Sequence, residues 1–241
     1  LQLMQAMGYD AAAVGNHEFD FKPQGFAAMI GAALKQTETL PKLLMSNVRF
    51  DHSAPEDDAL QAYMESGILA REAIIEKGGL RFGIIGLMGT NAAEVAKDTA
   101  PLTFDKNTEV AHRMSYLLKN KHKVDVVILL SHGGILKAPS GNWIGEDFDL
   151  AEAAPEIDLV VGGHSHTPLK EPLLSKSGTP ILQAGSDGRF LGEIEMELTP
   201  QGLKVINYTL HAIDDSIPGK PEITQLVDTV KQTISEKILK P

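Results

Sequence analysis

The chain alternates short apolar runs with longer amphipathic stretches, and each apolar run ends in a polar or glycine-rich segment. The apolar runs lie near residues 11, 44, 81, 124, 157 and 180. Their length and their content of β-branched residues predict buried strands rather than helices. Because strands alternate with helix-like stretches, we predict an α/β fold of the layered kind, a β-sheet sandwich flanked by helices.

Two of the amphipathic stretches predict helices. Residues 25–36 are rich in alanine and follow Pro23. Residues 108–121 place four apolar side chains on one face, at the spacing of a helix turn: Val110, Met114, Leu117 and Leu118.

The pattern changes toward the C-terminus. Residues 192–200 and 202–213 alternate apolar and polar side chains around a turn. This pattern predicts an antiparallel hairpin with one solvent-exposed face. After the segment PGKP at 218–221, residues 223–239 have the pattern of a helix. We therefore expect one domain over residues 1–217, followed by a linker helix over 218–241 that leads toward a further domain.

Three polar clusters follow directly on three predicted strands: GNHEFD at 15–20, SHGG at 131–134 and GHSH at 163–166. In open α/β sheets, sites form beyond the carboxyl ends of the strands. If the strands are parallel neighbours, five side chains converge on one edge: Asn16, His17, His132, His164 and His166. In an extended GHSH segment both rings point to the same side while Ser165 faces away. Imidazole nitrogens and amide oxygens are ligands for Zn²⁺, Mn²⁺ or Fe, so this edge is a candidate metal site.

Composition narrows the chemistry. The 241 residues contain no cysteine, which excludes disulfides, thiolate metal sites and cysteine nucleophiles. The net charge of −10 disfavours a nucleic-acid polymer as partner, because such binding relies on clustered Lys and Arg. A small anionic substrate stays possible if metal ions supply the positive charge. We predict no membrane span, since no apolar run approaches the ~20 residues that a membrane helix needs.

The three clusters resemble the later motifs of the calcineurin-like metallophosphoesterases. The six-residue motif GNHEFD resembles the form that this motif takes in the 5'-nucleotidase branch. GRFLG at 188–192 resembles the segment that follows the last metal motif in that branch. The resemblance implies a four-layer αββα fold and a periplasmic or extracellular location. It also implies a dinuclear-metal phosphomonoester hydrolase, in which metal-activated water attacks a phosphate ester, the substrate being a nucleotide.

The resemblance also implies roles for individual residues. Asn16, His132 and His164 would bind one of two divalent metal ions, and His166 would bind the other. His17 would stand beside the transferring phosphoryl group and stabilise it or protonate the leaving oxygen. Asp20 would hydrogen-bond His17 and set its tautomer. Two metals that clamp the attacking and leaving oxygens suit phosphoryl transfer, which calls mainly for positioning and charge neutralisation.

The opening Asp-x-His and Gly-Asp motifs of that family have no counterpart in this sequence. Neither Asp51 with His52 nor the pair Glu146 and Asp147 replaces them. We expect these motifs to precede Leu1, so that the chain is an internal or N-terminally truncated piece of a larger enzyme. With part of the metal site missing, it is expected to bind metal weakly and to turn over slowly.

The same residues are compatible with other functions. A cyclic-nucleotide phosphodiesterase or a sulfur-ester hydrolase could use the same metals, and a binding module could keep the fold without the chemistry. A structural zinc domain is disfavoured because no closed set of four ligands can be assembled. We interpret the remaining histidines as structural or solvated: His52, His112, His122 and His211. Trp143 could cover the site or reach substrate, although packing in its own loop is favoured, and Asp147 is a candidate for holding the SHGG loop. Arg189 could face a phosphate or form a structural ion pair.

Overall fold

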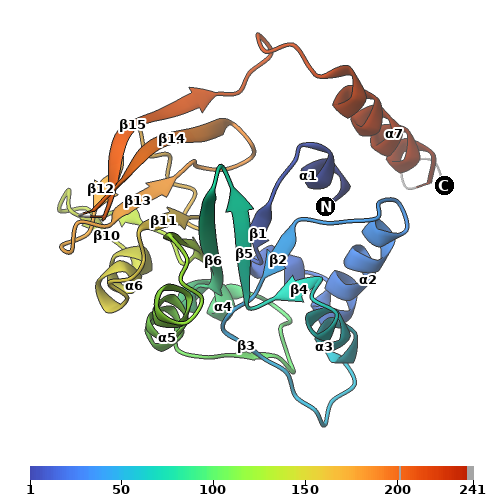
Figure 1. Ribbon diagram of the computed structural model, residues 1–241. Helices are drawn as coiled ribbons and strands as arrows, with labels where there is room; N and C mark the ends of the chain where they lie inside the picture. The colour runs from blue at the N-terminus through green and yellow to red at the C-terminus, as the bar shows by residue number, and fades with distance from the viewer. Residues whose placement is uncertain (201, 238–241) are drawn as a thin grey trace.

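A computed structural model of the chain describes residues 1–200 and 202–237 (Figure 1). The helices are α1 (Gln2–Ala6), the 3₁₀ turn η1 (Asn16–Phe19), α2 (Lys22–Leu34), α3 (Asp58–Glu65), α4 (Thr90–Val95), α5 (Asn107–Asn120), α6 (Glu146–Ala153) and α7 (Pro221–Lys237).

Within the described part of the chain, the strands fall into two main sheets and three two-stranded pairs. They are β1 (Ala11–Ala13), β2 (Lys42–Leu44), β3 (Val48–Arg49), β4 (Leu69–Ala70), β5 (Glu72–Lys77), β6 (Leu80–Met88), β7 (Thr103–Phe104), β8 (Val126–His132), β9 (Leu136–Lys137), β10 (Trp143–Ile144), β11 (Leu159–Gly162), β12 (Leu173–Leu174), β13 (Pro180–Gln183), β14 (Phe190–Thr199) and β15 (Gly202–Ala212).

The larger sheet has six strands in the order β12-β13-β11-β8-β6-β5. Its four central strands β13, β11, β8 and β6 are parallel, and an antiparallel strand closes each edge. The interior strands β8 and β11 carry near-continuous apolar sequence, as expected where both faces of a parallel sheet are covered. Their carboxyl ends lie side by side, which places the SHGG and GHSH segments next to each other.

The smaller sheet is parallel, in the order β1-β2-β4, and packs against the larger one. Leu44 from β2 meets Ala73 and Ile84 of the larger sheet in a buried cluster between the two. A side chain at Gly86 would collide with Leu44, so glycine lets the two backbones approach at this point. Ser46 accepts a hydrogen bond from Gly86 N (3.0 Å) and its own amide donates to Gly86 O (2.7 Å), which ties the sheets together.

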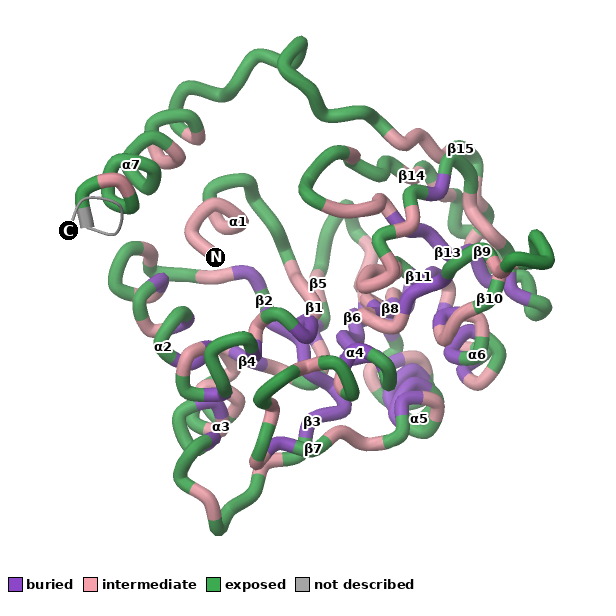
Figure 2. The backbone as a smooth tube through the Cα atoms, turned by 180° about the vertical axis from the view of Figure 1, so that it is seen from behind, coloured by how far each residue is buried: buried purple, intermediate pink, exposed green. Residues whose placement is uncertain are grey.

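Helices cover the two outer faces. One buried cluster joins α5 and α6 to the larger sheet through side chains such as Met114, Leu150 and Val160. A second joins α2 and α3 to the smaller sheet through Phe26, Ile30 and Leu60. The result is four layers, helix–sheet–sheet–helix, and Figure 2 shows the buried positions concentrated in them. The predicted αββα sandwich is therefore confirmed.

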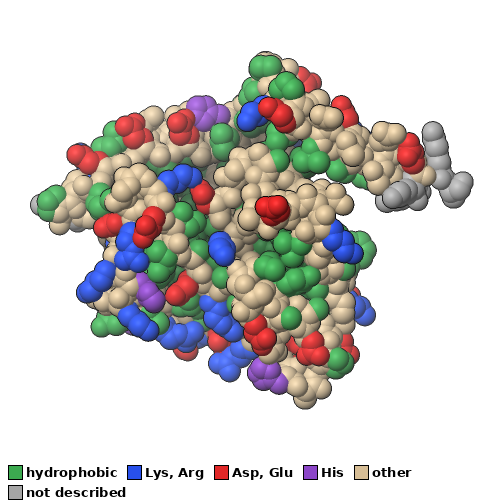
Figure 3. Space-filling view, turned by 45° about the vertical axis from the view of Figure 1, so that its right-hand side comes forward, with side chains coloured by type: hydrophobic (Ala, Val, Ile, Leu, Met, Phe, Trp, Pro, Cys, Tyr) green, Lys and Arg blue, Asp and Glu red, His purple; other side chains and the backbone are tan. Residues whose placement is uncertain are grey.

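The hairpin β14–β15 and the helix α7 extend away from these layers (Figures 1 and 2). The hairpin is antiparallel, as predicted, with a bulge between Glu195 and Met196. Figure 3 shows acidic side chains along the upper edge of one face, over the hairpin and the segment that leads to α7, and basic side chains gathered toward its lower left. Helix α7 lies beside α1, and Leu226 and Val230 line a groove there together with Leu3. The proposed division into a domain and a linker helix stays a prediction.

The predicted strands near residues 11, 44, 81, 124, 157 and 180 correspond to β1, β2, β6, β8, β11 and β13. The predicted helices correspond to α2, α5 and α7, although residues 238 and 239 of the last lie outside the described residues. One detail was wrong. Leu117 is 37% exposed, because the buried stripe of α5 runs through Val110, Met114 and Leu118 and leaves Leu117 at its margin. Among the described residues, we find no helix long and apolar enough to cross a membrane.

Candidate metal centre

The first polar cluster folds as the turn η1, directly after β1. Glu18 accepts a hydrogen bond from the Gly15 amide (2.8 Å), which caps the turn, and Phe19 is fully buried with its ring edge-on to Phe26. These anchors hold Asn16 inward, where it is 8% exposed, while the His17 side chain points outward and is 73% exposed. Neighbours in sequence thus occupy two environments, one suited to a fixed ligand and one to a group that meets solvent and substrate.

The second cluster begins in the last two residues of β8. Side chains alternate across a strand, so Ser131 points toward α6 and His132 points to the opposite side. There His132 Nε2 lies 2.9 Å from Asn16 Oδ1. A side chain at Gly15 would stand 2.7 Å from the His132 ring, so glycine is needed for this approach. Two atoms that are 116 residues apart in sequence therefore face each other, across the junction of the two sheets.

The third cluster follows β11, and here one expectation was wrong. The GHSH segment is not extended: His164 and His166 have φ angles of 65° and 55°, in the left-handed region. Only a few per cent of non-glycine residues adopt this conformation. It persists because Ser165, between them, faces away as expected and places Oγ within hydrogen-bond reach of Gln183 Oε1 (2.9 Å) and of Ile135 O, to either of which its one proton can be donated.

Gln183, at the end of β13 and 1% exposed, is the second anchor of this turn. Its Oε1 also accepts from Thr167 N (3.0 Å), and its Nε2 donates to Gly163 O. The rings of His132 and His164 consequently lie together, with centroids 5.1 Å apart.

The assumption that the strands are parallel neighbours holds for β8 and β11 but fails for β1. Strand β1 belongs to the smaller sheet, so Asn16 and His17 reach the site from a different layer. They arrive at the same edge because β1 packs across the interface against β6 and β8. Asn16, His132 and His164 are brought together. His17 and His166 lie near enough for their charges to act on both His132 and His164.

The electrostatics favour neutral imidazoles. Burial, with the charges of His164, His17 and His166, lowers the pKa of His132 to about 4. Burial and the charge of His166 also lower the pKa of His164. Crowded histidines resist protonation because each added charge repels the others. At neutral pH these rings therefore keep lone pairs that a cation can accept.

His17 and Asp20 form a pair at the rim, with His17 Nδ1 3.0 Å from Asp20 Oδ2. The side chains are 73% and 46% exposed, so the pair meets solvent. A carboxylate on one ring nitrogen fixes the tautomer and directs the other nitrogen outward. The predicted contact between these two residues is present; their catalytic role stays a prediction.

The donor set fits a divalent cation in part. An amide oxygen and two neutral imidazoles converge at Asn16, His132 and His164, and such donors suit Zn²⁺, Mn²⁺ or Fe. Within residues 1–200 and 202–237, no group of three or more His, Asp or Glu side chains could hold a metal, so the Asn16 amide is needed as third donor. A second cation would find His166 alone of the predicted ligands. The assignment of all four ligands stays a prediction.

Sequence reasoning missed two polar residues beside His164. Asn91, in the first turn of α4, places Oδ1 3.1 Å from His164 Nε2. Glu146 accepts from Thr90 N (2.8 Å), Thr90 Oγ1 (2.6 Å) and Asn107 Nδ2 (2.8 Å). Both belong to polar segments that follow strands, Asn91 after β6 and Glu146 after β10, so the strand-end rule could have identified them.

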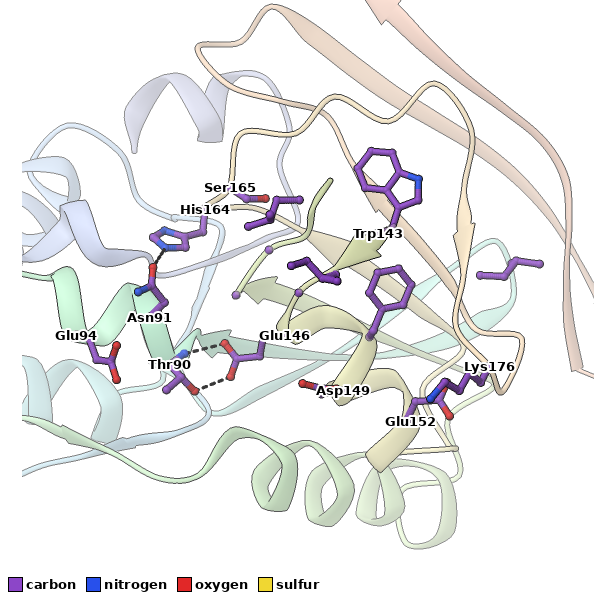
Figure 4. Close-up of a pocket in the computed structure, with 17 residues that line it drawn as sticks. Thr90, Asn91, Glu94, Trp143, Glu146, Asp149, Glu152, His164, Ser165 and Lys176 are labelled. Carbon is purple, nitrogen blue, oxygen red and sulfur yellow. Dashed lines mark hydrogen bonds between the residues drawn. The ribbon is translucent and has the colours of Figure 1, made fainter. Parts of the chain in front are cut away.

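His164, Asn91 and Glu146 line a cleft of about 1050 Å³. Figure 4 shows His164 and Asn91 on one side, Glu146 in the middle and Trp143 on the other side. Trp143 packs against the core around α6 and carries Lys137 over its ring at 5.6 Å. It therefore serves loop packing and also lines the cleft.

The other residues interpreted as structural make ordinary contacts. His211 pairs with Glu193 across the hairpin (2.6 Å), and His122 lies 3.8 Å from Glu72. Arg189 forms an exposed ion pair with Asp187 (3.4 Å). His52 and His112 are exposed. Asp147 does hold the SHGG loop, accepting from Ser131 Oγ (2.6 Å) and Gly134 N (3.0 Å).

Comparison with known proteins agrees with this fold. The sequence profile of the calcineurin-like phosphoesterase family matches residues 1–168, more than half of the chain. The chain belongs to the calcineurin-like phosphoesterase family.

Named relatives point to one branch. An apyrase from Tabanus yao is 28% identical over 97% of this chain and 41% of its own length. A 5'-nucleotidase from Vibrio cholerae is 28% identical over 86% of this chain and 38% of its own length. The crystal structure of a 5'-nucleotidase precursor from Thermus thermophilus matches with a TM-score of 0.72 at 26% identity, covering 97% of this chain and 45% of that one. The chain thus spans about two fifths of the length of these relatives.

Proposed function

We propose that the chain forms a metal-dependent phosphomonoester hydrolase of the 5'-nucleotidase type, or the greater part of its metal-binding face. The observation that carries this proposal is the convergence of Asn16, His132 and His164 at the junction of the two sheets, with His17 on the rim. Family membership and relatives named apyrase and 5'-nucleotidase support it.

In this proposal Asn16, His132 and His164 bind one divalent cation and His166 contributes to a second. The cations, when bound, would supply positive charge for the phosphate and acidify water. An anionic substrate could then bind although the protein carries a net charge of −10. His17, on the exposed rim, donates a hydrogen bond or a proton to the ester oxygen that leaves. Asp20 holds Nδ1 of His17, so that Nε2 is the nitrogen presented to substrate.

We also propose a small phosphate ester, a nucleotide, as the substrate. Location in the periplasm or outside the cell and a further domain that follows α7 belong to the same proposal. Their support is the resemblance of the motifs and the activities for which the relatives are named.

Activity of the intact protein tests the proposal directly. After metal removal, the protein is reloaded with Zn²⁺, Mn²⁺ or Fe²⁺ and offered 5'-AMP, ATP, a cyclic nucleotide and a sulfur ester. We expect phosphate release from the 5'-nucleotides, dependent on added metal and abolished in His132→Ala. His211→Ala is the matched control, since this histidine lies on the hairpin and should leave activity unchanged.

Preference for the cyclic nucleotide or the sulfur ester would replace the proposed substrate class while keeping the metal site. Failure to bind any of the three metals would contradict the proposal and favour a binding module without the chemistry.

A further inference from the structure

One buried carboxylate, that of Asp147 on α6, lies behind two of the loops that carry candidate ligands. The side chain is fully buried. Its Oδ1 accepts two hydrogen bonds from the SHGG segment, from Ser131 Oγ at 2.6 Å and from Gly134 N at 3.0 Å. These two donors flank His132 in sequence. One oxygen therefore fixes the backbone on both sides of that histidine.

The other oxygen, Oδ2, contacts the neighbouring strand β11. It has no hydrogen-bond partner. It occupies the space that a side chain at residue 162 would take, lying 2.3 Å from the position of a Cβ built on Gly162. Gly162 is the last residue of β11, two residues before His164, and it pairs in register with Ser131 of β8. The carboxylate thus rests against the ends of both strands at once.

The alternation of side chains explains why this matters for the site. Ser131 points back toward Asp147, and His132, the next residue, points forward to Asn16. Any shift of the Ser131 backbone is passed to the His132 ring, and any shift of Gly162 is passed to the turn that carries His164. The distance of 5.1 Å between the two ring centroids depends on both strand ends being held.

We propose that Asp147 is a positioning residue that sets the spacing of the His132 and His164 loops and thereby the affinity of the site for divalent cations. This inference rests on the proposed function only in taking His132 and His164 as ligands. Removing a residue that holds a metal ligand in place commonly lowers metal affinity by about 10- to 100-fold.

Cation affinity is the measurement that tests it, because it needs no catalysis. The intact metal-free protein is titrated with Zn²⁺ or Mn²⁺ in a calorimeter, well below its unfolding temperature. We expect Asp147→Ala to weaken binding by about tenfold. Asp147→Asn keeps the shape and both acceptor bonds at Oδ1, so its affinity should stay within about threefold of wild type. Equal losses in the two variants would overturn a positioning role.

A matched control separates this role from general destabilisation. Asp57 is also fully buried and also has one carboxylate oxygen without a partner, while its Oδ2 holds the Asp51 amide at 3.0 Å. It lies before α3, in a loop that carries no candidate ligand. Asp57→Ala should lower the unfolding midpoint and leave cation affinity unchanged. A loss of affinity as large as that of Asp147→Ala would contradict the proposal.

Milder changes keep the test informative if Asp147→Ala does not fold. Ser131→Ala removes one of the two bonds at Oδ1 and should weaken binding by about threefold. Gly162→Ala places a methyl group against Oδ2 and should weaken binding by about tenfold in the wild-type background. In the Asp147→Ala background, where Oδ2 is absent, the same change should cost less than about twofold. Additive effects of Asp147→Ala and Gly162→Ala would show that the contact does not couple the loops.

The same titrations distinguish the inference from the proposed function. If His132→Ala weakens binding and Asp147→Ala does not, the positioning role fails and the proposed function stands. If His132→Ala has no effect, His132 is not a ligand, and both the proposed function and the inference fail.

Discussion

The two sides of the candidate site are built differently. The side formed by SHGG and GHSH is backed by fully or almost fully buried polar residues, Asp147 and Gln183, which hold the backbone at several points. The side formed by η1 also holds one buried ligand candidate, Asn16, but it presents His17 on an open rim, where one contact to Asp20 holds it. A metal ligand loses affinity if it moves, whereas a residue that exchanges protons with substrate must be reachable. The difference in construction therefore matches the difference in proposed roles.

The largest expected effect comes from removing a ligand on the buried side. His132→Ala takes away one of three donors and should weaken the binding of Zn²⁺ or Mn²⁺ by more than about 100-fold. Mutation of residues that only hold a metal ligand in place already lowers affinity by up to about 100-fold. Calorimetric titration of the intact protein measures it, with His211→Ala as the control. An unchanged affinity would mean that the buried side does not serve a metal.

On the exposed side, the corresponding change should separate catalysis from binding. His17→Ala is expected to lower kcat by about 100-fold, the usual contribution of a positioned acid or base, while cation affinity stays within about twofold. Metal titration and the rate of phosphate release from 5'-AMP are compared in the same preparation. If His17→Ala weakens cation binding as much as His132→Ala does, the distinction between the two sides is lost.

A pH dependence of stability is expected from Asp147 on the buried side. Burial raises the pKa of Asp147 from 3.8 to about 6, so the folded protein keeps a proton that the unfolded chain releases above pH 3.8. The stability that depends on this bound proton is fully present below about pH 4 and is lost as the pH rises to about 6. Asn does not titrate, so the unfolding free energy of Asp147→Asn, relative to wild type, should rise by about 2 kcal/mol between pH 4 and pH 7.

Chemical denaturation of the metal-free protein at pH 4, 5, 6 and 7 measures this difference. A difference that stays constant across the four pH values would show that the Asp147 carboxyl titrates at its ordinary pKa.

A smaller effect is expected at the second buried anchor. Gln183→Ala removes three hydrogen bonds from the GHSH turn and should weaken cation affinity by about tenfold, since His164 and His166 then lose their left-handed support. Gln232→Ala on α7, whose amide donates to the exposed Glu236, is the control. If both variants bind cations equally well, the turn holds its shape without Gln183.

Much of this organisation could be predicted from the sequence, and the reason is local. Apolar runs such as 124–130 and 157–161 mark buried strands, and a polar cluster after each run marks the carboxyl edge of a sheet. The chemical nature of the three clusters then identified the family. Helix α5 was predicted from its spacing, apart from the exposed Leu117, because spacing gives the direction of a stripe and not its width.

Other features depend on contacts between segments far apart in sequence. Nothing in the run at residues 11–14 indicates that β1 lies beside β2 in a separate sheet of the order β1-β2-β4. The left-handed turn at His164 and His166 could not be predicted either, because it is imposed by Ser165 and by Gln183, which lies on a different strand further along the chain. Asn91 was missed, although it follows β6, because a single asparagine is a weaker signal than a histidine cluster and only the fold places it beside His164.

Anomalous scattering from crystals of the intact protein soaked in Mn²⁺ tests the central claim most directly. The account predicts a peak within about 2.0–2.3 Å of Asn16 Oδ1 and of ring nitrogens of His132 and His164. Peaks only at surface carboxylates, or a well-diffracting soaked crystal with no peak beside these three side chains, would contradict it.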